Sequence, residues 1–188
     1  MNEAVIGQFK TKYEMLSGIV HVAQNALEVA EVAMSVLQAL EGKRVALGEM
    51  PEAVTEAVES ACQAAGIEVL KPPFDNTLLP KSIDDAAVGV SWAALAVAES
   101  GSLVEFDTND ATRLVSTLPD THVGIVLASE LVETLKEAAS PIRAFLEANP
   151  ENANVTFISG PSRTADIEMK LTLGVHGPEV AHAIILQD

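Results

Sequence analysis

The sequence predicts an α/β fold with a mainly parallel sheet flanked by helices. Three observations support this class. Strands and helices alternate from residue 43 onward, several strands are apolar without interruption, and turn residues separate the elements. Uninterrupted apolar strands are typical of parallel sheets, because both faces of such a sheet are covered. With 188 residues, 48% of them hydrophobic, the chain can form one domain with a buried core.

The N-terminal part follows a different pattern. Residues 1–42 are predicted to be helical throughout, with a break at Gly18 and a stop at Gly42. We therefore divide the chain into an N-terminal helical segment, 1–42, and an α/β domain, 43–188. The apolar stripe of the second helix suits packing against that domain. It also suits docking on another subunit or on a second copy in a homo-oligomer.

The elements expected after residue 42 alternate regularly. Strands are predicted at 43–48, 67–71, 86–90, 102–106, 121–129, 153–160 and 181–187. Helices are predicted at 51–66, from Ser91 or Trp92 onward, at 109–119, and at 129–150 with a disturbance near Pro141. Three prolines make 72–82 a loop. Residues 165–173 alternate with period two, and we expect a short helical turn after Thr164 that leads into an extended segment.

The charge balance excludes several classes of partner. Eleven basic and 27 acidic residues give a formal net charge of -16, which repels phosphate backbones and anionic membranes. The longest apolar run, 86–98, is too short to span a bilayer, and the N-terminus lacks the pattern of a secretory signal. We therefore expect a cytoplasmic protein with no nucleic-acid partner and no membrane insertion.

Cysteine usage limits the redox chemistry of the chain. Cys62 is the one cysteine of the sequence, so an intramolecular disulfide, a thiolate-held iron–sulfur cluster and a structural zinc site are excluded within this chain. No histidine pair shows a metal-binding spacing, and we expect no metal site. If redox chemistry is involved, its metal centre belongs to another polypeptide.

Three polar segments follow predicted strands or helices at places where α/β sheets bind ligands: 98–102, 127–130 and 159–164. In the last of these, Gly160 permits a sharp turn, and Ser162, Arg163 and Thr164 offer two hydroxyls and a guanidinium in succession. This combination suits a small carboxylate or phosphate. A tight turn whose hydroxyl caps a helix explains the same residues.

Two histidines and a glutamate carry further possible chemistry. His176 lies between two glycines and His122 opens a strand, so either could transfer a proton, although a turn histidine bonded to backbone is the simpler interpretation. Glu99, followed by Ser100 and Ser102, could bind a polar ligand or act as a base, or it could be a solvated turn residue. His21 and His182 lie in periodic patterns, and we interpret them as structural.

The segments "AESGSLV", "PDTHVGIVLAS" and "TFISGPSRTADIEMKLTLGVHGP" resemble the LUD (lactate utilization) domain family, in particular its LutC-type stand-alone members. The final block matches that pattern without interruption from Gly160 to Pro178. The resemblance covers about residue 43 to the end. Ser100 and Ser102 stand where threonines are typical, which keeps the hydroxyls.

The resemblance implies a fold similar to sugar isomerase and CoA-transferase-like (NagB/RpiA-like) domains. It also implies a role in oxidising L-lactate to pyruvate beside partner subunits that carry iron–sulfur clusters, with no cofactor in this chain. The residues that match the family pattern are expected to surround a ligand pocket, and we infer the roles within it from the side chains themselves, because the family supplies no agreed catalytic assignment for this subunit. The catalytic set is Glu99, His122 and His176, and the binding set is Ser100, Gly101, Ser102, Gly160, Ser162, Arg163, Thr164 and Asp166.

Three functions remain open from the sequence. In a lactate-oxidising subunit, Arg163 would hold the substrate carboxylate and His176 or His122 would accept the hydroxyl proton. A stand-alone enzyme or binding protein would use the same pocket for a phosphosugar, a CoA ester or a folate-like ligand, with Glu99 as base or nucleophile. A scaffolding or regulatory subunit would only hold partners.

Overall fold

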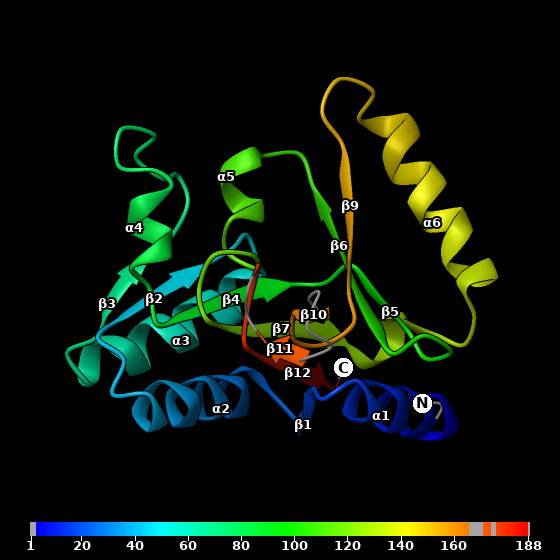
Figure 1. Cartoon of the computed structure of the whole chain (residues 1–188), viewed down its shortest axis with the longest axis horizontal. Coiled ribbons are helices and arrows are strands. Elements are labelled where there is room, and N and C mark those ends of the chain that lie inside the picture. The colour runs from blue at the N-terminus through cyan, green and yellow to red at the C-terminus, as the bar shows by residue number, and fades with distance from the viewer. Residues whose placement is uncertain (1–2, 166–170, 174–175, 188) are drawn as a thin grey trace.

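A six-stranded parallel sheet forms the centre of the molecule (Figure 1). The computed structural model describes residues 3–165, 171–173 and 176–187. In sheet order the strands are β1 (Ile19–Ala23), β12 (Val180–Leu186), β7 (Thr121–Leu127), β4 (Val88–Trp92), β2 (Arg44–Leu47) and β3 (Glu68–Leu70). Every neighbouring pair in this sheet is parallel. The central strands are apolar on both faces because both faces are covered.

Helices α2 (Ala26–Ala39) and α3 (Glu52–Ala64) cover one face of this sheet. The side chain of Asn25 caps α2 by accepting hydrogen bonds from the backbone N–H groups of Leu27 and Glu28. The apolar stripes of the two helices pack on alternate residues of the strands, such as Val88 and Val123. This layer forms the larger part of the hydrophobic core.

A second sheet and α1 (Glu3–Met15) cover the opposite face. The second sheet has the order β8 (Leu131–Val132), β5 (Leu95–Val97), β6 (Ser102–Asp107) and β9 (Asn154–Ile158). Helix α6 (Leu135–Ala148) packs on its outer side, where the rings of Phe106 and Phe145 stack. Two short helices, α4 (Lys81–Asp84) and α5 (Asp110–Arg113), and a 3-10 turn η1 (Ala128–Glu130) complete these connections.

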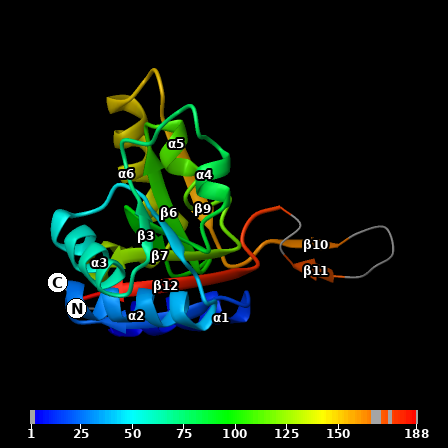
Figure 2. The ribbon, with the colours of Figure 1, turned by 90° about the vertical axis from the view of Figure 1, so that its left-hand side faces the viewer.

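A separate hairpin extends away from both sheets (Figure 2). It consists of β10 (Arg163–Ala165) and β11 (Leu171–Leu173), which pair antiparallel. The helical turn expected after Thr164 is therefore wrong over 163–165, where the backbone is extended. Residues 166–170 lie outside the described residues.

The predicted fold class, α/β with a mainly parallel sheet flanked by helices, is confirmed. The helical prediction for 1–42 is wrong at Ile19–Ala23, which forms β1. Strand pairing outweighs local helix propensity here, because this segment hydrogen-bonds to β12, which lies about 160 residues later in the chain. The N-terminal segment thus supplies an edge strand of the central sheet as well as two helices.

Three further helix predictions need correction. Ser91 and Trp92 continue β4, and the alanine-rich residues after them form β5, because pairing with β6 and β8 outweighs local helix propensity. The helix expected over 109–119 is limited to Asp110–Arg113. The helix expected over 129–150 begins at Leu135, where Thr134 caps it, and runs through Pro141.

Gly89 in β4 is a site where the close packing of layers can be tested. An added Cβ would lie 1.9 Å from the carbonyl oxygen of Val115, so Gly89→Ala forces backbone apart and should lower the free energy of unfolding by about 1–3 kcal/mol. Gly7, at an exposed position of α1, has no atom within 4 Å of such a Cβ. Gly7→Ala should therefore leave stability unchanged or raise it by up to about 1 kcal/mol. Urea unfolding of both variants checks this, and equal effects would contradict it.

Candidate functional site

Strands β4, β6 and β7 direct polar side chains into the space between the two sheets. Gly89 of β4 pairs with His122 of β7, and Ser91 pairs with Gly124, so Ser91 and His122 lie diagonally on the same sheet face. In β6, Leu103, Glu105 and Asp107 alternate with residues that face α6, because side chains along a strand alternate between its faces. The polar group is thus built from three separate chain segments.

Gly124 leaves room for the imidazole of His122. A Cβ at Gly124 would lie 3.1 Å from Cε1 of His122 and 2.4 Å from Cδ1 of Leu103. The imidazole therefore lies over a strand position that carries no side chain, and β6 can approach β7 closely. His122 is fully buried as a result.

The buried carboxylate of Glu105 is held by hydroxyl donors on both oxygens. Ser91 donates to Oε1 of Glu105, and Ser116 donates to Oε2 at 2.8 Å. A hydroxyl has one proton, so Ser91 must accept the 2.7 Å hydrogen bond from His122 Nε2. His122 therefore carries a proton on Nε2, which also lies 3.6 Å from Glu105 Oε1. Its Nδ1 is buried with no partner among the described residues.

This network keeps a negative charge inside the protein. Burial acts to raise the pKa of Glu105, but the attraction of His122, whose Nε2 lies 3.6 Å away, and the hydroxyls of Ser91 and Ser116 hold it below its ordinary value. The effect reaches Tyr13 of α1, where burial and the nearby charge of Glu105 both raise the phenol pKa. Glu105 is thus an ionised carboxylate that two hydroxyl donors and the nearby His122 stabilise.

A pocket of about 240 Å³ opens beside this network, at the carboxyl ends of β2 and β4. Ligands of open α/β sheets bind at this edge. Its walls combine carboxylates, hydroxyls, an amide and three aromatic side chains from four segments: Gly48, Glu49, Ser91, Trp92, Ala94, Glu105, Phe106, Asp107, Thr108, Asn109, Thr112 and Phe145. The Ser91–Glu105–His122 network therefore connects this pocket to the interior.

Asp107 gives the pocket a second titratable carboxyl group. Burial, then the charges of Glu105 and Glu49, raise the pKa of Asp107 to about 6, although Arg113 acts to lower it. Its Oδ2 is buried without a hydrogen-bond partner among the described residues. The pocket therefore contains one carboxylate that stays ionised and one carboxyl group that exchanges a proton close to neutral pH, an arrangement suited to acid–base chemistry.

The three predicted catalytic residues lie in different settings. His122 belongs to the buried network. Glu99 is exposed and accepts a 3.2 Å hydrogen bond from the backbone N–H of Leu135, so it stabilises the first turn of α6. His176 is exposed in the segment that follows β11. Among these three residues, His122 is the one whose side chain hydrogen-bonds to another polar side chain in the described part of the chain.

The predicted serines and glycines form a second cluster. Ser100 and Ser102 share a 2.9 Å hydrogen bond, and Ser102 shares a 2.7 Å one with Ser159. Gly101 and Gly160 have positive φ angles of 62° and 107°. A Cβ at either would come within 2.8 Å of backbone atoms of α1 or of Leu16 just after it. The two glycines therefore let the end of α1 pack closely against this hydroxyl cluster.

Ser162, Arg163 and Thr164 lie at the base of the hairpin or in its first strand. The backbone N–H of Ser162 donates to the carbonyl of Pro178 at 2.9 Å, which joins the two ends of the hairpin segment. For Arg163 and Thr164 the structure describes the backbone in β10 alone. Asp166 lies outside the described residues.

Sequence reasoning missed Ser91, Glu105, Asp107 and Ser116. One signal was present: the predicted strand "SLVEF" and the residue directly after it carry two acids at alternate positions of an otherwise apolar segment. Acids in a buried strand are rarely left unpaired, so they indicate a polar site. Ser91 and Ser116 gave no such signal, because the strand pairing that brings them to Glu105 is long-range.

Comparison with known protein families finds a match that covers almost the whole chain. A family model described as the LUD domain matches residues 6–186. The chain belongs to the LUD domain family. The match includes β1 and α2, so this family's domain extends into the N-terminal part, for which the sequence segments that resemble the family gave no signature.

Relatives named Lactate utilization protein C are similar to part of the chain. Lactate utilization protein C of Shouchella clausii is 39% identical over 118 residues, which are 61% of this chain and 52% of that protein. The corresponding proteins of Bacillus subtilis and of a Geobacillus strain are 38% and 40% identical, over 57% and 61% of this chain and 45% and 49% of theirs. The matched region spans about half the length of these relatives.

A solved structure supports the fold. The crystal structure of a DUF162 family protein from Deinococcus radiodurans aligns with a TM-score of 0.70 and 19% sequence identity, over 99% of this chain and 98% of that one. This likeness shows the architecture alone. No helix in the described part of the chain is long and apolar enough to cross a membrane.

Asp107 should make stability depend on pH in a defined window. Its folded pKa of about 6 exceeds the ordinary value near 3.9, so between about pH 4 and 6 the folded state keeps a proton that the unfolded state releases. Its contribution to the free energy of unfolding therefore falls as pH rises through this window. Asp107→Asn should gain stability relative to the parent protein from pH 4 to 6, with no further gain above 7.

Urea unfolding at several pH values measures this difference. Asp84→Asn, a substitution on exposed α4, is the matched control and should show no such trend. A constant difference between Asp107→Asn and the parent protein would show that Asp107 has an ordinary pKa.

Proposed function

We propose that this chain is a lactate utilization protein that takes part in oxidising L-lactate to pyruvate beside iron–sulfur subunits. The observation that carries the proposal is the LUD domain match across residues 6–186, together with relatives named Lactate utilization protein C. The chain's one cysteine is consistent with electron acceptance on another polypeptide.

In this proposal the carboxyl-edge pocket binds the substrate. Oxidation of lactate to pyruvate removes two electrons and two protons, one of the protons from the hydroxyl group. Glu105 is ionised, lines the pocket and touches Ser91, so it is positioned to accept that proton directly or through the Ser91 hydroxyl. His122 supports this role by donating to Ser91. The C–H hydrogen leaves with the electron pair of its bond, as a hydride equivalent, to an acceptor on the partner, which accounts for the second proton and both electrons.

The substrate carboxylate needs a separate cation. Glu49, Glu105 and Asp107 line the pocket and repel an anion, whereas Arg113 is close enough to lower the pKa of Asp107. Arg163 is the binding residue that the family resemblance implies. Carboxylate recognition is therefore assigned to an arginine. Arg163, which the family resemblance implies, is the first candidate, and Arg113, whose charge acts on Asp107 of the pocket, is the second.

The acidic lining also favours a second candidate function. Carboxylates accept hydrogen bonds from sugar hydroxyls, so a stand-alone enzyme acting on a hydroxyl-rich ligand would use the same pocket. A phosphorylated sugar would again require an arginine. Turnover by the isolated chain, without partners, would favour this candidate over the first.

The test is L-lactate-dependent reduction of an artificial electron acceptor by the chain co-expressed with its iron–sulfur partners. Glu105→Gln removes the proton acceptor and should lower kcat by about 100-fold or more. Arg163→Ala should raise KM for lactate. Arg143→Ala, on the exposed side of α6, is the matched control and should leave both constants unchanged.

Two outcomes decide between assignments. Undiminished turnover with Arg163→Ala would remove Arg163 from the site and leave Arg113→Ala to be tested. Undiminished turnover with Glu105→Gln would overturn the role of the carboxyl-edge pocket. Because Glu105 is buried, Ser91→Ala provides a smaller change, and circular dichroism establishes that each variant is folded.

A further inference from the structure

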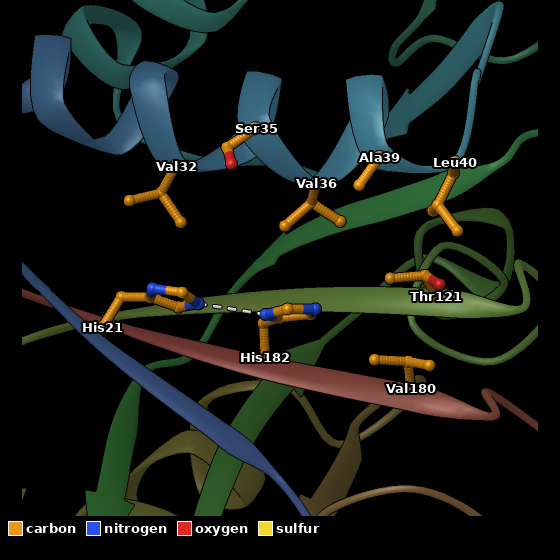
Figure 3. Close-up of a pocket in the computed structure, with 9 residues that line it drawn as sticks. All are labelled: His21, Val32, Ser35, Val36, Ala39, Leu40, Thr121, Val180 and His182. Atoms are coloured by element: carbon orange, nitrogen blue, oxygen red, sulfur yellow. Dashed lines mark hydrogen bonds between the residues drawn. The ribbon is translucent and has the colours of Figure 1, made fainter.

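A second cavity lies on the other side of the central sheet, away from the carboxyl-edge pocket. It has a volume of about 290 Å³ and lies between the second half of α2 and the amino ends of β7 and β12 (Figure 3). Most of its wall is aliphatic. The lining residues are His21, Val32, Ser35, Val36, Ala39, Leu40, Thr121, Val180 and His182.

Two histidines form the polar part of this cavity. Nε2 of His21 and Nδ1 of His182 are 3.0 Å apart and share one hydrogen bond, and the two rings lie nearly parallel at 19°. His182 is 92% buried, since its exposed fraction is 8%. Figure 3 shows its other ring nitrogen, Nε2, directed along the cavity between α2 and β7. Within the described residues, Nε2 has no hydrogen-bond partner.

Both histidines are uncharged at neutral pH. Burial, then the charges of His21 and His122, lower the pKa of His182 to about 4. Burial and the charge of Lys10 lower the pKa of His21. No lysine or arginine is among the lining residues, so the cavity offers no countercharge to a carboxylate or a phosphate.

The shared proton lets the pair adapt to its ligand. A neutral imidazole has one N–H group. If His21 donates to His182 Nδ1, then His182 carries its proton on Nε2 and offers a donor to the cavity. If His182 donates to His21, then Nε2 of His182 is an acceptor. The same site therefore accepts either a carbonyl or a hydroxyl group.

The volume limits the ligand to a small molecule. An engineered apolar cavity of about 150 Å³ takes benzene, so 290 Å³ accommodates a ring with a few more atoms. Leu40 and Val180, which are 47% and 36% exposed, extend the apolar surface at the rim. Apolar walls with one oriented polar group are typical of small-molecule sites.

We propose that this cavity binds a small uncharged molecule with an apolar body and one hydroxyl or carbonyl group, which hydrogen-bonds to Nε2 of His182. A metal ion fits less well. The two facing nitrogens already bond to each other, and the described residues contain no group of three or more His, Cys, Asp or Glu side chains that could hold a metal.

The test compares 4-methylphenol with toluene, which has the same apolar body and no hydroxyl. Isothermal titration of the full chain should show 4-methylphenol binding about three- to tenfold more tightly, because one hydrogen bond separates the two ligands. His182→Leu should remove this difference. Ala39→Leu, which adds volume to the wall, should weaken both ligands. Gln38→Leu, an exposed neighbour on α2, is the matched control and should change neither.

A second measurement uses the unchanged protein, so it does not depend on how the variants fold. Long-range proton–nitrogen NMR spectra distinguish the tautomers of His182, and 4-methylphenol should shift the Nε2 resonance towards an acceptor nitrogen. Cyclohexanone, which can only accept, should favour the tautomer with a proton on Nε2. Failure of 4-methylphenol to bind, equal affinity for toluene, or His182 resonances unchanged at saturation would each overturn the proposal.

Discussion

The burial of the Glu105 carboxylate between two sheets is the constraint on which the centre of this structure depends. A charge removed from water is destabilising unless donors surround it. Here the donors come from β4, from the turn after α5 and, through Ser91, from β7. These elements must therefore be placed together before the carboxylate is stabilised. The network links their positions to one another more strictly than apolar packing would.

Small residues make this arrangement possible. Gly89 and Gly124 lie on the face where the second sheet and the α5 turn approach the central strands, and any side chain there would collide with them. Gly101 and Gly160 likewise leave room for the backbone of α1 and of the residue that follows it. Several residues that identify the family in the sequence thus have a packing role that is visible in the structure. Their presence in a signature does not require them to touch a ligand.

The two cavities offer opposite chemistry on one sheet. At the carboxyl ends of β2 and β4, carboxylates and hydroxyls face a small polar pocket with an ionised group and a group that titrates near neutral pH. At the amino ends of β7 and β12, an uncharged histidine pair faces aliphatic walls. Parallel strands allow this, because all of their carboxyl ends lie at one edge and all of their amino ends at the other.

The sequence by itself determined the fold class, most strands of the central sheet and the family. Uninterrupted apolar strands, turn residues and a local signature are sufficient for those conclusions. Tertiary structure decided the rest. Ile19–Ala23 became a strand because β12 pairs with it, and Glu105 gained partners from strands that are distant in the chain. Contacts of this kind depend on register and on which elements become neighbours, and neither is encoded in a local pattern of residues.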